Sequence, residues 1–443
     1  MSTLFLPCAS GTEPLLAEEV ARIAGRPGEA GRGGVWIEGD ALLAMRLNLE
    51  SRLAQRVLWP LIDGPYADEH ALYDLARRVD WLRWITPAQT LRVDVNAVRS
   101  PLQSLNFAAL RIKDAVCDVV REQLGERPSV DTRHPDLPLA LFLGPDHATL
   151  YADTSGEALF KRGWRDVRDG GVKGEAPLKE TLAAAMLAAA GWYGRAEDGP
   201  LLDPCCGAGT IAIEAAQIAC GIAPGAQRRF AFERMLPFRP QQAAWRAMQQ
   251  AARDRVHSPN VAVFAGDVSF RMTDFATRNA ERAGVLHAIE FKTADALQRL
   301  PPAPSGVMML NPPYGERIEA KGTGSSPYGE SIKSALYGDS TKSAPYGDIT
   351  KSAPYGAEGP ESAPRGAREG FEGGGSSAEF FGGLAAHWKR HYAGWTGWLL
   401  SPDPKLPTLM RLKESRRVPM RNGAIECRLF RFDMVAGSNK GPA

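Results

Sequence analysis

Two short motifs, in which polar residues follow an apolar stretch, contain the candidate ligand-binding and catalytic residues of this chain. The first is residues 203–210, Asp-Pro-Cys-Cys-Gly-Ala-Gly-Thr, which precede an expected helix at 211–220. The second is residues 307–314, Val-Met-Met-Leu-Asn-Pro-Pro-Tyr. Both are expected where strands end, and open α/β sheets collect ligands beyond those carboxyl ends. The two loops can therefore share one crevice.

The glycines of the first motif are typical of a loop that approaches a ligand closely. Gly207 and Gly209 allow a sharp turn without Cβ clashes, and the helix start that follows offers free N–H groups to a carboxylate. From these residues alone, an ordinary strand-to-helix turn is an equal alternative. The spacing departs from the dinucleotide fingerprint, Gly-x-Gly-x-x-Gly with an acid about 20 residues later, and this disfavours NAD.

Three acids follow three expected strands. Asp203 closes the first strand, Asp267 follows a strand-like run at 260–266, and Asp295 follows another at 285–293. Any one of them alone is more often a helix N-cap than a ligand. In series behind the glycine turn they favour S-adenosylmethionine, with Asp203 near its amino-acid end, Asp267 at the ribose and Asp295 at the adenine amine.

The second motif has the groups needed to hold a planar amine. The exocyclic amine of a base is a poor nucleophile because its lone pair is delocalised, so acceptors must aim its nitrogen at a methyl sulfonium. Asn311 offers a side-chain oxygen and Pro312 a backbone carbonyl, while Pro312 and Pro313 fix φ. Tyr314 offers an aromatic face for an extruded base. The alternative is a plain Asn-Pro turn.

The first 165 residues alternate short strands and helices without a catalytic constellation. This pattern predicts a small α+β region. The expected strands are 1–8, 34–38, 90–98, 139–143 and 148–153, and the expected helices are 13–23, 40–49 and 104–124.

On these motifs the chain resembles bacterial THUMP-domain RNA guanine methyltransferases, above all the 23S ribosomal RNA enzymes that methylate the 2-amino group of guanine. The resemblance rests on residues 203–210, on Ala-Pro-Leu-Lys-Glu-Thr-Leu-Ala-Ala-Ala at 176–185 and on Asn-Pro-Pro-Tyr-Gly-Glu-Arg-Ile at 311–318. It covers nearly the whole chain except about 320–378. Older descriptions call such proteins adenine-specific DNA methylases.

The resemblance implies a fold and a domain order. The expected fold is α/β, a Rossmann-like class I S-adenosylmethionine-dependent methyltransferase domain preceded by an α+β THUMP and ferredoxin-like region that recognises RNA shape. The implied domains are a ferredoxin-like portion at 1–50, a THUMP domain at 51–160, and a methyltransferase domain at 165–319 and 379–435. Some family members carry a second methyltransferase domain, and this chain is expected to be the single-domain form that makes one modification.

The resemblance also implies which residues contact cofactor and target base. The residues implied to contact S-adenosylmethionine are Glu180, Thr181, Asp203, Cys205, Gly207, Gly209, Asp267 and Asp295. Those implied to take the target base are Asn311, Pro312, Pro313 and Tyr314.

Composition bounds the class of protein. With 443 residues and 44% hydrophobic residues, two or three domains with sizeable cores are expected. No run of about 18 apolar residues occurs and no signal-like N-terminus is present, so we expect a soluble cytoplasmic protein without a membrane partner. The six cysteines include no Cys-x-x-Cys spacing, so we expect reduced thiols and no metal site.

Basic residues cluster in two places although the net charge is only +2. Residues 405–421 hold six basic side chains against one acid, and Arg416, Arg417 and Arg421 are predicted to meet RNA phosphates. A solvated face is an equal alternative. A second predicted RNA-binding cluster, at the junction of the two regions, consists of Arg162, Trp164, Arg165 and Arg168.

Residues 320–378 differ from the rest of the chain. A Ser-Ala-Pro-Tyr-Gly-like unit recurs there every nine residues, and Gly, Ser and Pro dominate. We predict a disordered low-complexity insertion.

The preferred function is methylation of the guanine 2-amino group, with ribosomal RNA or its assembly precursor as partner. Two alternatives stay open: a methyltransferase acting on adenine or on a glutamine amide, and a non-catalytic RNA-binding assembly factor. The oligomeric state is left open.

Overall fold

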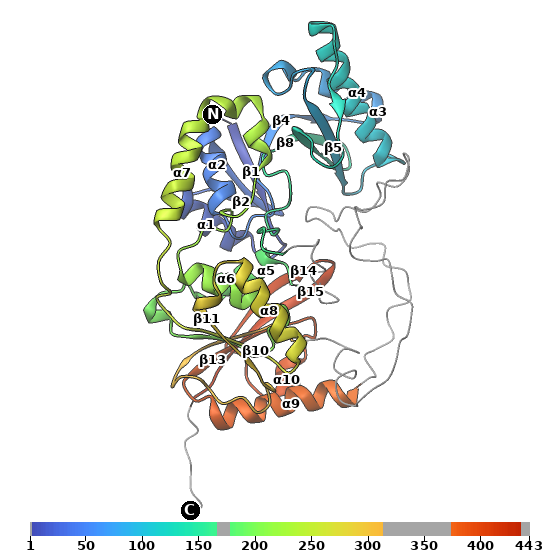
Figure 1. Ribbon diagram of the computed structural model, residues 1–443. Helices are drawn as coiled ribbons and strands as arrows, with labels where there is room; N and C mark the ends of the chain where they lie inside the picture. The colour runs from blue at the N-terminus through green and yellow to red at the C-terminus, as the bar shows by residue number, and fades with distance from the viewer. Residues whose placement is uncertain (1, 166–177, 313–373, 436–443) are drawn as a thin grey trace, which may run out of the picture.

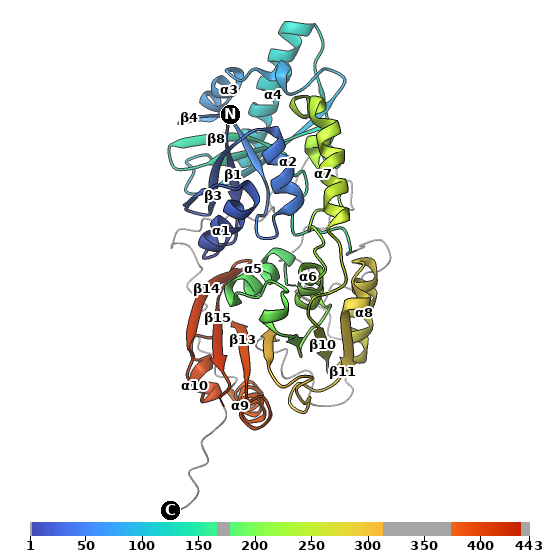
Figure 2. The same cartoon turned by 90° about the vertical axis from the view of Figure 1, so that its left-hand side faces the viewer.

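The computed structural model describes residues 2–165, 178–312 and 374–435. In this part of the chain the strands form two sheets, one of eight strands and one of seven. Figures 1 and 2 show an N-terminal half and a C-terminal half stacked on each other, each built around one of these sheets. The chain is therefore an α+β half followed by an α/β half, as the sequence predicts.

The N-terminal half contains the eight-stranded sheet, with strand order β2-β3-β1-β4-β8-β7-β5-β6. Its strands are β1 (Ser2–Pro7), β2 (Glu29–Gly31), β3 (Gly34–Gly39), β4 (Leu58–Pro65), β5 (Thr90–Ala97), β6 (Ser129–Val130), β7 (Leu137–Leu143) and β8 (His147–Asp153). Its helices are α1 (Glu13–Ala24), α2 (Ala41–Glu50), α3 (Glu69–Arg77), η1 (Trp81–Arg83) and α4 (Leu105–Leu124). Strands β1 and β4 share a single registered pair, Phe5 with Leu58. Strand pairing in the sheet is therefore shortest where the two expected N-terminal domains meet.

The C-terminal half has the order β11-β10-β9-β12-β13-β15-β14. Its strands are β9 (Leu201–Asp203), β10 (Val263–Asp267), β11 (Ile289–Thr293), β12 (Gly306–Leu310), β13 (Trp395–Ser401), β14 (Arg416–Asn422) and β15 (Ile425–Asp433). The first five strands in this order pair in parallel, and β15 is antiparallel to both of its neighbours. The chain order reverses between β9 and β12, and such a switch point opens a crevice at the carboxyl edge of a sheet.

Helices connect the strands of this sheet, and those within residues 231–254 pack against α2 and β7 of the N-terminal half. The helices are α5 (Glu180–Ala190), η2 (Ala196–Asp198), α6 (Thr210–Ala219), η3 (Ala231–Arg234), η4 (Leu236–Gln241), α7 (Gln242–Asp254), α8 (Phe270–Arg282), η5 (Leu286–Ala288), α9 (Gly374–His391) and α10 (Leu406–Met410). Helix α9 begins at Gly374, so the last five residues of the predicted insertion, 374–378, are helical and that boundary is wrong. The rest of the insertion lies outside the described residues.

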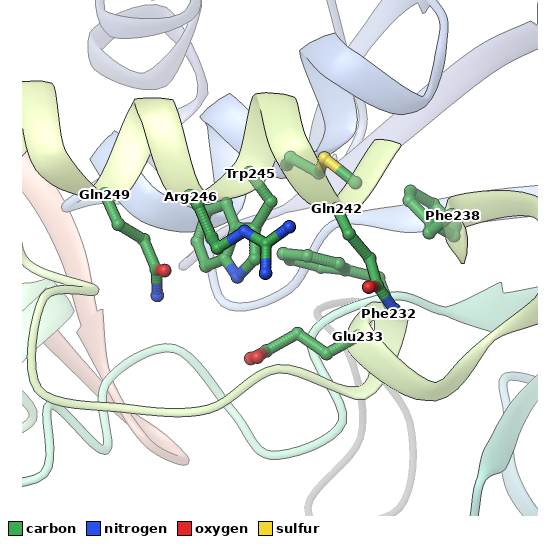
Figure 3. A pocket seen from close by; sticks show the side chains of 8 residues that line it. Phe232, Glu233, Phe238, Gln242, Trp245, Arg246 and Gln249 are labelled. Atoms are coloured by element: carbon green, nitrogen blue, oxygen red, sulfur yellow. The ribbon is translucent and has the colours of Figure 1, made fainter. Parts of the chain in front are cut away.

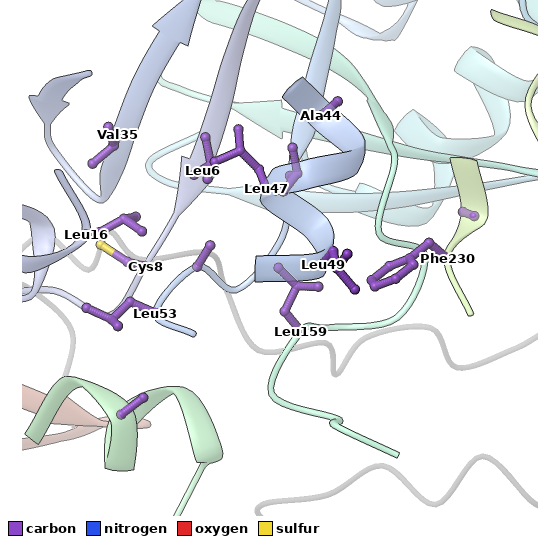
Figure 4. Close-up of a cluster of buried hydrophobic side chains, with 14 of the residues drawn as sticks. Leu6, Cys8, Leu16, Val35, Ala44, Leu47, Leu49, Leu53, Leu159 and Phe230 are labelled. Carbon is purple, nitrogen blue, oxygen red and sulfur yellow. The ribbon is translucent and has the colours of Figure 1, made fainter. Parts of the chain in front are cut away.

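The two halves are joined by apolar packing, part of which Figure 4 shows. Leu6 and Leu53 lie in one cluster of buried side chains with Phe230 and with Leu159, which belongs to the linker after β8 (residues 154–165). At the far edge of the seven-stranded sheet, a Cβ atom on Gly11, whose φ is +89°, would lie 2.4 Å from the backbone oxygen of Pro419. Because nothing larger than hydrogen fits there, the two halves approach backbone to backbone.

A pocket of about 190 Å³ opens beside α7 (Figure 3). Its aromatic lining is Phe232, Phe238 and Trp245, and none of its lining residues belongs to the strand-end loops described below. Across the described ranges, no helix is both long and apolar enough to cross a membrane.

Candidate active site at the carboxyl edge of the seven-stranded sheet

The glycine turn after β9 adopts a backbone that only glycine takes readily. Gly207 has a φ of +52° and Gly209 a φ of +84°, and Gly209 is the N-cap of α6. A Cβ atom on Gly209 would lie 3.0 Å from the Cβ atom of Ala276, so the turn is also pressed against α8. The predicted turn and the helix start are confirmed as structure, and the free N–H groups of α6 face the crevice end of β9.

Asp267 connects the glycine turn to the neighbouring strand. It ends β10, whose Ala265 pairs with Asp203 of β9, so the two acids lie at one edge. One carboxylate oxygen accepts the Gly207 N–H at 3.1 Å, and the other accepts the Ser269 N–H at 2.9 Å. Two backbone donors thus fix the direction of a nearly buried carboxylate.

Asp203 is 1% exposed and has an unusual titration. Burial, opposed by the Cys205 N–H and the Arg299 guanidinium and assisted by the Asp267 charge, raises the pKa of its carboxyl from 3.8 to about 8. A carboxyl group with this pKa is largely neutral at pH 7. A bound cation would draw it into its charged form.

The remaining predicted cofactor residues lie nearby. Asp295 follows β11, next to β10, and its side chain accepts the Leu297 N–H at 2.9 Å, the contact of a short polar turn. Cys205 is half-buried. Cys206 is buried, donates its N–H to the Gly266 oxygen at 2.7 Å, and burial raises the pKa of its thiol.

Three residues at this edge escape the sequence analysis. Arg299 is 6% exposed and donates to the Ala265 oxygen at 2.8 Å, which places a cation under the two acids. Val268 and Phe270 follow Asp267 and are 56% and 76% exposed, an apolar surface beside the carboxylate. The signal for these two was an apolar pair at a helix start, where polar residues are usual. No sequence signal marks Arg299, because its role depends on a turn that returns under β10.

Asn311 and Pro312 follow the strand next to β9, on the side away from Asp267. They follow β12, which pairs with β9 through Val307–Leu201 and Met308–Leu202. Asn311 is half-buried and Pro312 is buried. Acids and amide therefore stand at the ends of adjacent strands, as the two motifs predict. Pro313 and Tyr314 lie outside the described residues.

Known proteins match the chain in three consecutive pieces. Residues 3–58 match the RlmL ferredoxin-like domain, residues 66–153 the THUMP domain and residues 162–338 the RMKL-like methyltransferase domain. A ribosomal RNA large subunit methyltransferase K/L of Shewanella baltica is 32% identical over 445 residues, which cover 99% of this chain and 54% of the relative. The chain belongs to the THUMP-domain methyltransferase family. It spans about half the length of the curated relatives that it matches.

Solved structures share the fold over nearly the whole chain. SMU.472, whose crystal structure is a complex with S-adenosylhomocysteine, has a TM-score of 0.77 at 22% identity, and the match covers 99% of each chain. A predicted N6-adenine-specific DNA methylase from Listeria monocytogenes has a TM-score of 0.74 at 26% identity, over 97% of this chain and 96% of its own. The C-terminal half therefore has the Rossmann-like fold of S-adenosylmethionine-dependent methyltransferases, as predicted.

The predicted RNA-binding cluster at the junction is wrong for two of its members. Arg162 is 3% exposed and forms an ion pair with Glu214 of α6 at 3.0 Å. Trp164 is 1% exposed. The linker runs between the two halves of the protein, so both side chains are buried in packing contacts and cannot meet phosphates. Arg165 is partly exposed but lies 2.6 Å from Glu180, and Arg168 lies outside the described residues.

Glu180 and Thr181 begin α5 and are both buried. Burial raises the pKa of the Glu180 carboxyl, and the Arg165 charge opposes this change. Glu180 already has a partner, so any cofactor contact would share it with Arg165.

The arginines of β14 remain candidates for phosphate contacts. Arg416 and Arg417 are exposed at the edge of the sheet, and Arg421 is half-buried. Arg417 pairs with Glu414 at 2.6 Å, and Arg421 pairs with Glu426 at 3.1 Å. Exposed pairs of this kind are weak, so phosphates could compete for both arginines.

Proposed function

We propose that this protein is an S-adenosylmethionine-dependent methyltransferase that methylates the exocyclic 2-amino group of a guanine in 23S ribosomal RNA. One observation carries the proposal: the acid-and-glycine loops of β9 and β10 and the Asn311-Pro312 loop of β12 end at the same edge of one sheet. A cofactor and a planar amine can meet there.

The cofactor half uses charge and an apolar face. The N–H groups at the start of α6 suit the cofactor's carboxylate, and Asp267 suits its ribose diol. Asp203, whose carboxyl has a pKa of about 8, suits the positive amino group at the amino-acid end. Val268 and Phe270 offer apolar surface to the adenine ring, and Asp295 offers its amine an acceptor.

The base half uses acceptors on a stiff loop. The Asn311 oxygen and the Pro312 carbonyl would accept the two amine hydrogens and so aim the nitrogen lone pair at the methyl group. S-adenosylmethionine supplies a methyl group on a sulfonium. The methyl passes to the nitrogen, the sulfonium becomes a neutral thioether, and one amine proton leaves to solvent.

The ribosomal RNA substrate rests on the names of the relatives, and guanine rests on the resemblance of the motifs to RNA guanine 2-amino methyltransferases. The THUMP match at 66–153 and the ribosomal RNA methyltransferase names of the curated relatives support an RNA substrate, either mature 23S RNA or its assembly precursor. The Listeria monocytogenes neighbour is described as an adenine methylase, which keeps adenine as the second candidate base.

A deletion strain separates these readings. Mass spectrometry of its 23S RNA should show that one guanine, methylated in the parent strain, lacks its methyl group. The intact gene on a plasmid should restore this methylation. Loss of a methyladenine instead would replace guanine by adenine. An unchanged RNA would contradict the proposal.

A further inference from the structure

The linker between the two halves contacts the cofactor loop at successive residues. Arg162 pairs with Glu214 of α6 at 3.0 Å, which anchors the linker to the helix that follows the glycine turn. Trp164 and Arg165 come next and engage the turn itself from two sides.

The first side runs through Arg165. One guanidinium nitrogen donates to the hydroxyl of Thr210, the first residue of α6 and the residue directly after Gly209. Another lies 2.6 Å from Glu180, the first residue of α5. The guanidinium is stacked 4.8 Å from the ring of the buried Trp164. Packing and charge therefore hold Arg165 in one place, and Arg165 holds Thr210.

The second side runs through α8. The Asn279 amide nitrogen donates to the backbone oxygen of Ala208 at 2.9 Å. Arg282 donates to the Asn279 side-chain oxygen, and its Nε donates to the backbone oxygen of Trp164 at 3.0 Å. Asn279 is buried, so its amide has few other orientations. The linker, α8 and the turn thus form a closed chain of hydrogen bonds.

These two contacts flank Gly209, whose φ is +84°. Glycine adopts both signs of φ with little preference, so the residue itself does not select the left-handed turn. Contacts on Ala208 and Thr210, one residue before and one after, can select it. The turn then presents the α6 N–H groups in one direction.

We propose that Arg165 and Asn279 are positioning residues that hold the Ala208–Thr210 turn ready for the amino-acid end of S-adenosylmethionine. This inference rests on the proposed function. Neither residue needs to touch the cofactor. Arg165 stacks on Trp164, and Asn279 is held by Arg282, which also donates to the Trp164 backbone oxygen. The linker therefore connects the N-terminal half to the proposed cofactor loop.

Calorimetry with S-adenosylhomocysteine on the full chain tests the proposal. Asn279→Ala removes the contact to Ala208, and Thr210→Val removes the acceptor of Arg165 at nearly constant shape. Thr210→Ser keeps the hydroxyl and is the rescue variant. Thr277→Ala is the matched control, since it removes a 2.8 Å side-chain hydrogen bond to Thr273 within the same helix α8.

We expect Asn279→Ala and Thr210→Val each to weaken binding roughly tenfold, the effect of one lost hydrogen bond. Thr210→Ser and Thr277→Ala should stay within about twofold of the unchanged chain, less than a typical single hydrogen bond. Should Asn279→Ala fold poorly, Arg282→Ala changes an exposed residue and frees the Asn279 amide, with an expected loss of about threefold.

Several results would overturn the inference. Unchanged binding by Asn279→Ala and Arg282→Ala is one, and an equal loss in Thr277→Ala is another. A loss in Thr210→Val alone would mean that this hydroxyl touches the ligand directly. If the unchanged chain does not bind S-adenosylhomocysteine, the proposed function itself fails.

Discussion

At the scale of a single residue, the buried carboxyl of Asp203 lowers the free energy of unfolding once it is ionised. The pKa of its carboxyl rises from an ordinary 3.8 to about 8 when the chain folds. Between these values the folded chain binds a proton that the unfolded chain does not, so the free energy of unfolding falls as the pH rises through this window. The cost is largest above pH 8, where Asp203 is ionised in both states.

Asp203→Asn should therefore stabilise the protein in mildly alkaline buffer. The amide has the shape of the carboxyl and no charge to bury, so we expect a gain on the order of 1–3 kcal/mol at pH 8 and little change at pH 4. S-adenosylmethionine should bind more weakly, because the cation loses its partner. Thermal unfolding at both pH values is the measurement, and a loss of stability at pH 8 would contradict the assignment.

Asp267 should contribute to affinity rather than to stability. Asp267→Ala is expected to weaken S-adenosylmethionine by about 1.5–3 kcal/mol, the scale of hydrogen bonds to a charged group. Asp274→Ala, an exposed acid on α8 that pairs with Arg278, is the control and should bind normally. Calorimetry that finds equal affinity for both variants would move the ribose site elsewhere.

Asn311 should act on the amine and not on the cofactor. Asn311→Ala is expected to lower turnover by a barrier of about 2–4 kcal/mol, the effect of one lost acceptor of this kind. Cofactor affinity should hardly change, because the predicted cofactor contacts lie on other strands. Near-normal turnover at saturating RNA would exclude Asn311 from the proposed role.

At the scale of elements, Glu214 on α6 connects the two halves. It is fully buried and pairs with Arg162 at 3.0 Å and with Arg52, which follows α2, at 3.2 Å. Glu214→Ala leaves two guanidinium groups without their carboxylate, so we expect a loss of about 3–5 kcal/mol in the free energy of unfolding. Asp274→Ala breaks an exposed pair and should cost less than about 1 kcal/mol. If denaturant unfolding shows equal losses for Glu214→Ala and Asp274→Ala, Glu214 does not connect the two halves as described.

The sequence predicted elements where local pattern decides structure. The glycine turn, α6 and the strands before Asp267 and Asn311 follow from apolar runs and turn residues, which act over a few neighbours. Strand β4 was missed because Pro60 and Pro65 interrupt its alternation, and its register shifts between Pro60 and Ile62.

Errors arose where tertiary contacts decide. Arg162 and Trp164 have the composition of an RNA-binding surface, and only the path of the linker between two sheets buries them. Arg299 carries no local signal for the same reason. No strands were predicted at β14 and β15, because their arginines mask the apolar pattern to which the buried Leu429 and Phe430 belong.

At the scale of the whole molecule, one framework joins the THUMP-containing half to the glycine turn of the second sheet. The linker that leaves the THUMP-containing half pairs with α6 and contacts the glycine turn before the chain enters the second sheet. If the proposed function holds, a ribosomal RNA bound by the N-terminal half would be placed relative to the turn that is proposed to bind the cofactor.

Methyl transfer by the purified chain tests the central claim most directly. The full chain is incubated with methyl-labelled S-adenosylmethionine and unmodified 23S RNA or its assembly precursor, and the RNA is digested and its nucleosides are separated. We expect label in N2-methylguanosine with the unchanged chain and almost none with Asn311→Ala. Label in another nucleoside, or no transfer to either RNA, would contradict it.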